Sequence, residues 1–175
     1  MPAKIISAAL VGLEAQPIEV EVDLSIGLHS FSIVGLPDTA ISESKERVSS
    51  AVKNSGASPP HHSNRRVIVN LAPADLKKEG SLYDLPIAVA YLIASNQIQS
   101  VDLADKIFVG ELSLEGWIRP VNGILAIALM AQKKGFKTLF VPQNNKAEAA
   151  LVEGLEIIPV KRLNQLMEHL EGKKM

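Results

Sequence analysis

One stretch of the sequence, residues 70–90, constrains the fold more than any other. It reads NLAPADLKKEGSLYDLPIAVA, so a strand-like run ends at Leu71, a polar loop follows, and a helix pattern opens at Asp84. This helix is apolar on nearly all sides, and Pro86 is tolerated in its first turn. A helix without a polar face must be covered on both sides. The stretch therefore predicts a layered protein in which this helix is sandwiched rather than laid on the surface.

Three strand patterns come earlier in the chain. Residues 5–13 are apolar, residues 17–24 alternate strictly between apolar and acidic side chains, and residues 31–34 form a short third run. Strict alternation is typical of a strand with one buried face, so Ile18, Val20, Val22 and Leu24 should point to the core. Three successive strands with short connections favour an antiparallel meander.

Strand and helix patterns alternate through the rest of the chain. A helix is predicted from Asp38 or Thr39, as its N-cap, to residue 54, and Asp84 is expected to cap the helix that follows the polar loop. Later helices are expected at 122–134, 145–153 and 163–170, strands at 65–71, 137–141 and 155–159, and a hairpin around SLEG at 113–116. We predict a single α/β (α+β) domain over residues 1–172 with a mixed sheet, and a frayed tail at 173–175.

Composition and missing motifs exclude several kinds of site. The absence of cysteine rules out disulfides, thiolate catalysis and cysteine-ligated metals. No GxxxxGK[ST] sequence is present, so we expect no P-loop nucleotide site, and hence no cofactor, in these residues. His61 and His62 are adjacent in an extended loop, with only His29 and His169 besides, so we expect no metal site. The net charge of −1 gives no overall basic surface for nucleic acid.

The chain also lacks membrane signals. No apolar run approaches the roughly 18 residues that a membrane-spanning helix needs, and the N-terminus lacks the apolar segment of a signal peptide. We expect no membrane contact and a cytoplasmic location.

The polar loop permits one catalytic interpretation. A lysine can deprotonate a serine in serine-lysine hydrolases, and Ser81 is the only serine in the loop, near Lys77 and Lys78. The competing interpretation is that both lysines are exposed and solvated. Exposed basic side chains at Lys77 and Lys78, together with Arg65 and Arg66, would instead be candidates for contact with DNA or a protein partner. Trp117 is either a stacking platform or a plug at the margin of the core.

Three long strings carry a family resemblance. They are FSIVGLPDTAISESKERVSSAVKNSG, VNLAPADLKKEGSLYDLPIA and VGELSLEGWIRPVNGILAIALMAQKKG, in this order along the chain. Together they resemble the N-terminal, ChlI-like domain of the Mg-chelatase-like AAA ATPases of the ComM and YifB type. The resemblance implies the fold of the Lon proteolytic domain, which is shared with the second domain of a small-subunit ribosomal protein. It also implies that an AAA module, which binds ATP and Mg, follows this domain in the full-length protein.

The likeness to Lon can be read residue by residue. Lon's G-P-S-A-G string matches GSLYD at residues 80–84, which places the nucleophile position at Leu82. Its P-I-G-G-L-K string matches PVNGIL at residues 120–125, which places the lysine position at Leu125, in the apolar periodicity of a helix. A leucine can neither attack a carbonyl carbon nor accept a proton, so the resemblance implies a domain that is not an enzyme by itself.

What such a domain would do follows from the family. The resemblance implies a non-catalytic accessory domain that contacts DNA or neighbouring subunits, in a protein that acts on DNA during recombination in natural transformation. Its implied partners are its own AAA module, other copies in a hexamer, and DNA. Two alternatives remain: a serine-lysine hydrolase that uses Ser81, and a pure oligomerisation module.

Overall fold

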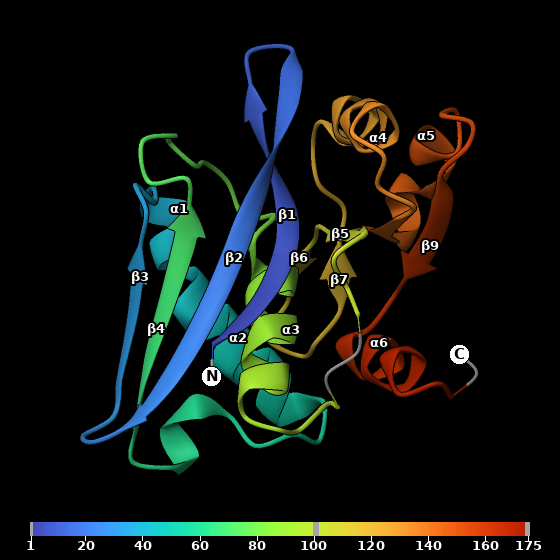
Figure 1. Ribbon diagram of the computed structural model, residues 1–175. Coiled ribbons are helices and arrows are strands. Elements are labelled where there is room, and N and C mark those ends of the chain that lie inside the picture. Colours follow the sequence, from blue (N-terminus) through green and yellow to red (C-terminus); the bar gives the residue numbers. More distant parts are fainter. Residues whose placement is uncertain (1, 100–101, 174–175) are drawn as a thin grey trace.

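A seven-stranded mixed sheet forms the centre of the structure, a computed structural model that describes residues 2–99 and 102–173 (Figure 1). The strand order is β3-β4-β2-β1-β5-β8-β9. β2 pairs antiparallel with both β1 and β4, and the other neighbouring strands are parallel. The strands are β1 (Ala3–Val11), β2 (Glu14–Ile26), β3 (Ser30–Val34), β4 (Arg65–Ala72), β5 (Lys106–Phe108), β8 (Thr138–Pro142) and β9 (Glu156–Val160). The predicted α/β fold class with a mixed sheet is confirmed.

Helices and a small hairpin complete the fold. The α-helices are α1 (Thr39–Ser42), α2 (Ser44–Asn54), α3 (Asp84–Ala94), α4 (Ile124–Lys133), α5 (Lys146–Ala149) and α6 (Leu163–Leu170), and two short 3₁₀ turns are η1 (Pro60–His62) and η2 (Gln143–Asn145). The predicted hairpin around residues 113–116 forms from β6 (Glu111–Leu112) and β7 (Ile118–Arg119). In the described part of the chain, no helix has the length and apolar character to cross a membrane.

The alternating pattern of residues 17–24 lies in β2, the long strand between β1 and β4. Ile18, Val20 and Val22 are fully buried and Leu24 packs against the core, as predicted. The acidic side chains of the same strand lie on the other face, which neither α2 nor α3 covers (Figure 1). Period-two alternation thus sets which face of the sheet carries the helices.

The predicted meander of the first three strands is wrong. β1 and β2 form the expected hairpin, but β3 pairs with β4, and it does so in parallel. The chain leaves β3, passes through α1 and α2, and returns as β4 between β3 and β2. A strand, helix and strand in succession favour parallel pairing through a crossover, and that longer connection decides the topology here.

The helix predicted from residue 38 to 54 is interrupted at Glu43, so that α1 and α2 are separate. Asp38 is the N-cap of α1, as expected, and its Oδ1 accepts the Ile41 N–H at 2.9 Å. The tail predicted at 173–175 falls largely outside the described residues. Only Lys173 belongs to them, and its N–H donates to the Glu168 carbonyl at 2.9 Å.

The apolar helix after the polar loop is α3, and it is sandwiched as predicted. All residues from Asp84 to Leu92 are buried. α3 packs on β1 and β2 on one side and on α2 on the other. This position fixes the polar loop, residues 73–83, at one end of the sheet.

Candidate functional site

The polar loop runs from the end of β4 to the start of α3, and α1 anchors it. Asp38 accepts two backbone N–H groups, from Ile41 through Oδ1 and from Gly80 through Oδ2, each at 2.9 Å. The loop also forms a parallel bridge between Pro37 and Lys78, whose N–H donates to the Leu36 carbonyl at 3.2 Å. Segments about 40 residues apart in sequence are therefore tied at one point.

The expectation that both loop lysines are exposed is wrong for Lys78. Its side chain is fully buried, and its Nζ donates to the carbonyls of Gly35, at 2.7 Å, and Pro73. Burial lowers the pKa of this ammonium group. Lys77 behaves as expected: it is exposed and pairs with Glu79 at 3.4 Å. Of the two lysines, Lys78 is thus buried and structural, whereas Lys77 is a surface charge.

Ser81 lies half-buried at the end of the loop. Its Oγ donates to Glu111 Oε2, on β6, at 3.0 Å. Among the described residues, no lysine donates to or accepts from Ser81. The serine-lysine pair of the catalytic interpretation is therefore not assembled in this structure.

Asp84 does not cap α3, because the N-cap position belongs to Tyr83. Instead the Asp84 carboxylate is fully buried and accepts four hydrogen bonds from three residues. Arg47 Nε and Nη2 donate at 2.6 and 3.1 Å, Ser44 Oγ donates at 2.5 Å, and the Leu112 N–H donates at 3.0 Å. The network joins α2, α3 and β6, so it holds the Ser81 and Glu111 pair in place.

Opposing effects act on this carboxyl group. Burial raises the pKa of Asp84, while the hydrogen bonds from Arg47, Ser44 and the Leu112 N–H oppose the rise. The hydrogen bond to Asp84 in turn raises the pKa of Arg47 and keeps its guanidinium charged. Next to Asp84, the Tyr83 hydroxyl is buried with no hydrogen-bond partner among the described residues, and burial raises its pKa.

The two positions at which the resemblance places Lon's serine and lysine, Leu82 and Leu125, have different surroundings. Leu82 is buried within the core cluster, and its carbonyl accepts the Gly110 N–H at 2.9 Å. Leu125 lies on α4 and is 38% exposed, so this leucine is not among the buried residues of the helix despite the apolar periodicity. Neither position presents a nucleophile or a base.

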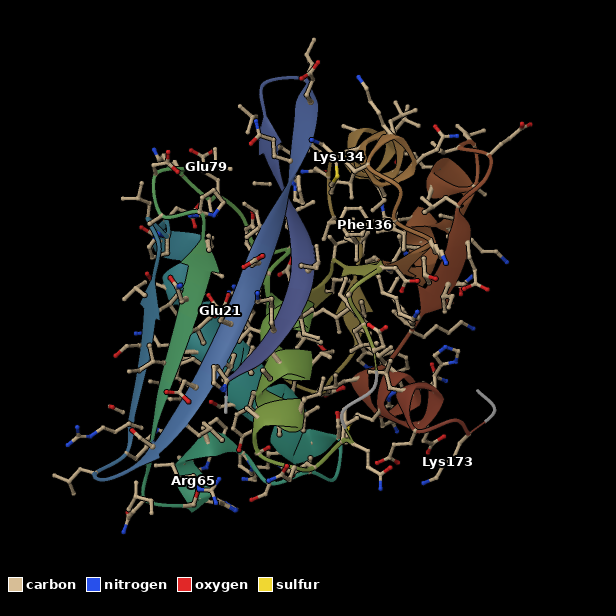
Figure 2. All side chains as sticks on the ribbon, in the orientation of Figure 1. Glu21, Arg65, Glu79, Lys134, Phe136 and Lys173 are labelled. Carbon is tan, nitrogen blue, oxygen red and sulfur yellow. The ribbon has the colours of Figure 1, made fainter. Side chains whose placement is uncertain are left out.

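The four basic candidates do not form one surface. Arg65 begins β4 at one end of the sheet, whereas the loop with Glu79 lies at the other end (Figure 2). β4 has eight residues, so its two ends are seven rises of about 3.3 Å apart, which separates the two groups by roughly 23 Å. His61 and His62 lie near Arg65, and in the described ranges no three acidic or histidine side chains are grouped to hold a metal ion.

Trp117 is neither buried nor alone. The residue is 45% exposed, and the guanidinium carbon of Arg162 lies 4.3 Å from the centroid of the Trp117 ring. An arginine over the face of a tryptophan is a favourable cation–π contact. The sequence alone gave no signal for this pairing, because the partners are 45 positions apart and meet only through the bridge between them.

The sequence is similar to those of known proteins. Residues 20–145 match the family model described as subunit ChlI of Mg-chelatase. The chain is 43% identical over 165 residues to the uncharacterized protein YifB of Escherichia coli and 38% identical over 172 residues to the competence protein ComM of Haemophilus influenzae. These matches cover 94% and 98% of this chain but only 32% and 33% of the relatives, so the chain spans about a third of their length.

A more distant sequence similarity is to a Lon protease. Lon protease 1 of Bacillus subtilis is 25% identical over 168 residues, which cover 90% of this chain and 21% of that protein. This similarity agrees with the α/β fold class, and the resemblance of the motifs places the reactive positions of Lon at Leu82 and Leu125.

Proposed function

The chain belongs to the family of the Mg-chelatase subunit ChlI, and from this premise we propose that it is a non-hydrolytic accessory domain of an AAA ATPase of the ComM and YifB type. Its work is to contact neighbouring subunits or DNA and to position a substrate for the ATPase. Binding of ATP and Mg, which the resemblance implies for the full-length protein, is assigned in this proposal to residues outside this chain, which spans about a third of the length of YifB and ComM. The setting is cytoplasmic.

One observation carries the proposal: the serine and the lysine of the serine-lysine interpretation, Ser81 and Lys78, each already have structural partners. Ser81 donates to Glu111, and Lys78 is buried between two carbonyl oxygens. The serine-lysine mechanism needs a lysine within hydrogen-bond reach of the serine hydroxyl that is free to accept its proton. The loop offers a lysine bound elsewhere, so its chemistry supports structure rather than acyl transfer.

A labelling experiment tests this proposal. The purified chain is incubated with a fluorescent fluorophosphonate probe, beside its Ser81→Ala variant and an active serine hydrolase as positive control. We expect no labelling of either form of the chain and no cleavage of a casein substrate. Labelling of the unaltered chain that disappears in Ser81→Ala would show a reactive serine and overturn the proposal.

The contact surface has a separate test. Fluorescence anisotropy with a duplex oligonucleotide measures affinity at several salt concentrations for the chain and for Arg65→Ala, Arg66→Ala and Lys77→Ala. Each lost phosphate contact reduces the slope of log K against log salt by about 0.9. Unchanged slopes in all three variants would exclude DNA as the partner of these residues. Light scattering of the same samples would then show whether the chain associates with itself, as a pure oligomerisation module would.

A further inference from the structure

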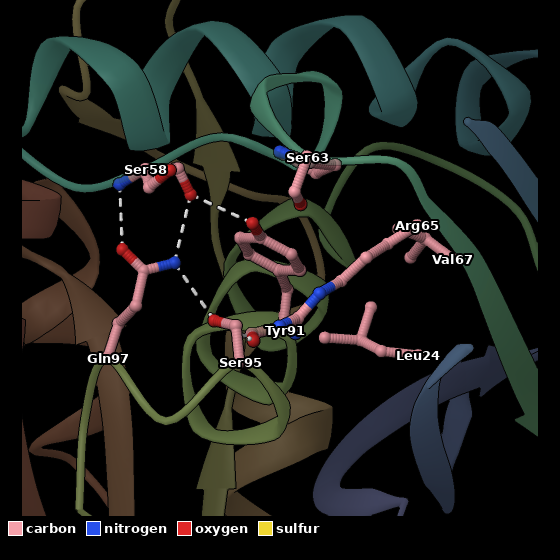
Figure 3. Close-up of a pocket in the computed structure, with 9 residues that line it drawn as sticks. Leu24, Ser58, Ser63, Arg65, Val67, Tyr91, Ser95 and Gln97 are labelled. Atoms are coloured by element: carbon pink, nitrogen blue, oxygen red, sulfur yellow. Dashed lines mark hydrogen bonds between the residues drawn. The ribbon is translucent and has the colours of Figure 1, made fainter. Parts of the chain in front are cut away.

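A small pocket lies between the loop at residues 58–63, the sheet and the end of α3 (Figure 3). Its volume is about 230 Å³. Leu24 and Val67 form its apolar floor on β2 and β4, and Arg65 extends into it from the start of β4. The remaining wall consists of Pro60 and of residues with hydroxyl or amide groups, which are Ser58, Ser63, Tyr91, Ser95 and Gln97.

Hydrogen bonds hold this wall in place before any ligand arrives. Tyr91 Oη donates to the Ser58 carbonyl at 2.8 Å. Gln97 Nε2 donates to the same carbonyl and to Ser95 Oγ, each at 2.9 Å, while Gln97 Oε1 accepts the Ser58 N–H at 2.7 Å. The loop is therefore fastened to the end of α3 by side chains from both, and the pocket is preformed.

Arg65 is the single charged residue in the lining. Within residues 2–99 and 102–173, its guanidinium makes no ion pair and no side-chain hydrogen bond, so its five N–H donors are available. No carboxylate competes for it from the lining. Burial raises the pKa of Tyr91, which keeps this phenol neutral.

The C-terminal end of α3 could repel an anion, because the last carbonyls of a helix carry partial negative charge. In this structure those carbonyls already accept hydrogen bonds. The Tyr91 carbonyl accepts from the Ser95 N–H at 2.9 Å and from Ser95 Oγ at 2.8 Å, and the Leu92 carbonyl accepts the Gln97 N–H at 2.8 Å. These bonds reduce the repulsion that an anion would meet.

We propose that this pocket binds a phosphate-type anion, with Arg65 as the charged contact and the hydroxyl groups of Ser63 and Ser58 as further donors. Arginine suits this role because its planar fork matches the geometry of phosphate oxygens. The volume is below the roughly 300–1,000 Å³ of pockets for drug-sized ligands, so the pocket suits a phosphate group with part of its substituent. The anion is either a free phosphate compound or the phosphodiester of a nucleic acid, and only the second source rests on the proposed contact with DNA.

The neighbouring Arg66 provides a matched control. Successive side chains of a strand point to opposite faces, so Arg65 enters the pocket while Arg66 lies on the other face of the sheet. The side chain of Arg66 crosses Gly27, where an added Cβ would lie 2.8 Å from its Nε. The two arginines have the same charge and adjacent positions, but only one lines the pocket.

The experiment compares Arg65→Gln with Arg66→Gln. Inorganic phosphate is titrated into each ¹⁵N-labelled protein and followed by the backbone NMR signals of residues 58–65 and 91–97, with sodium acetate at equal ionic strength as the control anion. We expect saturable shifts with phosphate in the unaltered chain and in Arg66→Gln, and binding weaker by about tenfold or more in Arg65→Gln, since a hydrogen bond to a charged group is lost. A Ser63→Ala variant should show a smaller loss.

The possible outcomes separate the sources and the alternatives. If an oligothymidine strand competes with phosphate for these signals, the ligand is a phosphodiester, and if it does not, the ligand is a free phosphate compound. Equal loss in both arginine variants, or equal shifts with acetate, would overturn the site in favour of diffuse electrostatics. A third outcome is that the unaltered chain shows no shifts with phosphate and that Arg65→Gln lowers the melting temperature. This result would overturn the site, because Arg65 would then only stabilise the fold at the end of α3. None of these results depends on whether Ser81 reacts with a probe.

Discussion

Replacing Arg47 with methionine tests the buried network in which Asp84 takes part. The substitution keeps an apolar stem of similar length but removes the two hydrogen bonds to Asp84 and a third, from Nη2 to the Ala40 carbonyl at 2.7 Å. The Arg47 side chain is only 17% exposed and that of Asp84 is 0% exposed, so water cannot replace the lost partner. Removal of one member of a buried ion pair costs about 3–5 kcal/mol.

The structure places the expected cost near the lower end of that range. Ser44 and the Leu112 N–H still donate to the carboxylate after the substitution. A loss of about 3 kcal/mol in a chain of this length lowers the melting temperature by about 6–12 °C. Urea unfolding at pH 7, followed by circular dichroism, measures the free energy directly. The surface pair of Lys77 and Glu79, 72% and 68% exposed, is the control, and Lys77→Met should change stability by at most about 0.5 kcal/mol.

The loss should depend on pH with a definite sign. Without Arg47, the buried carboxyl of Asp84 has an even higher folded-state pKa than in the unaltered chain, because burial raises it and the guanidinium no longer opposes the rise. The folded variant then holds a proton that the unfolded chain releases, so its stability falls as pH rises from the unfolded value of about 4 through the folded one. The difference in the free energy of unfolding between Arg47→Met and the unaltered chain is thus smallest in acid and increases toward neutral pH.

A second substitution provides the decisive comparison. Asp84→Asn in the Arg47→Met background removes the buried carboxylate that has lost its ion-pair partner, so the double variant should be more stable at pH 7 than Arg47→Met alone. The difference in stability between the double variant and the unaltered chain should also lose most of its pH dependence. If Arg47→Met costs less than about 1 kcal/mol, or if Asp84→Asn gives no recovery, the network is not a stabilising ion pair and the reasoning fails.

Three further substitutions have expected outcomes that thermal and urea unfolding can check. Lys78→Met leaves two carbonyl oxygens without their donor and should cost about 1–3 kcal/mol, and a loss below 0.5 kcal/mol, on the scale of a surface lysine, would contradict its internal role. Gly35→Ala should fail to fold stably, since its Cβ would lie 2.1 Å from the Leu71 carbonyl oxygen. Gly12→Ala is the control: this position has open space around it, so the substitution should cost only about 1 kcal/mol. Similar losses of stability in both variants would refute the steric argument. Tyr83→Phe removes a buried hydroxyl without a partner and should be neutral or stabilising, so a marked loss would reveal an interaction that the structure does not contain.

Local patterns predicted the elements of this fold well, for physical reasons that are visible in particular residues. The alternation of β2 follows from burial of one face, and Asp38 caps α1 because a carboxylate before a helix accepts its free N–H groups. The helix that is apolar all round is buried all round. In each case the cause lies within a few positions of the residue it acts on, so the sequence contains it.

The failures have the opposite character, since their causes lie far away in the sequence. Asp84 stands where a cap is expected, but its partner Arg47 is 37 positions earlier and only the packing of α2 on α3 brings them together. Lys78 looks like any surface lysine until the loop folds over the carbonyl of Gly35, 43 positions away. A charged residue has the same local signature whether it is solvated or buried with a partner, so sequence patterns could not separate these cases.

The loop at the protease-like position therefore stabilises the fold through the same kinds of residue that a hydrolase would keep free to react. Reactive groups in an enzyme are often poorly satisfied in the folded state, which is why replacing them tends to be neutral or stabilising. Here Ser81, Lys78 and Asp84 each have partners from other elements, so their replacement should reduce stability. The sign of the stability change on replacing Ser81, Lys78 or Asp84 consequently distinguishes residues that serve the fold from residues that retain chemistry, and it does so without knowledge of any substrate.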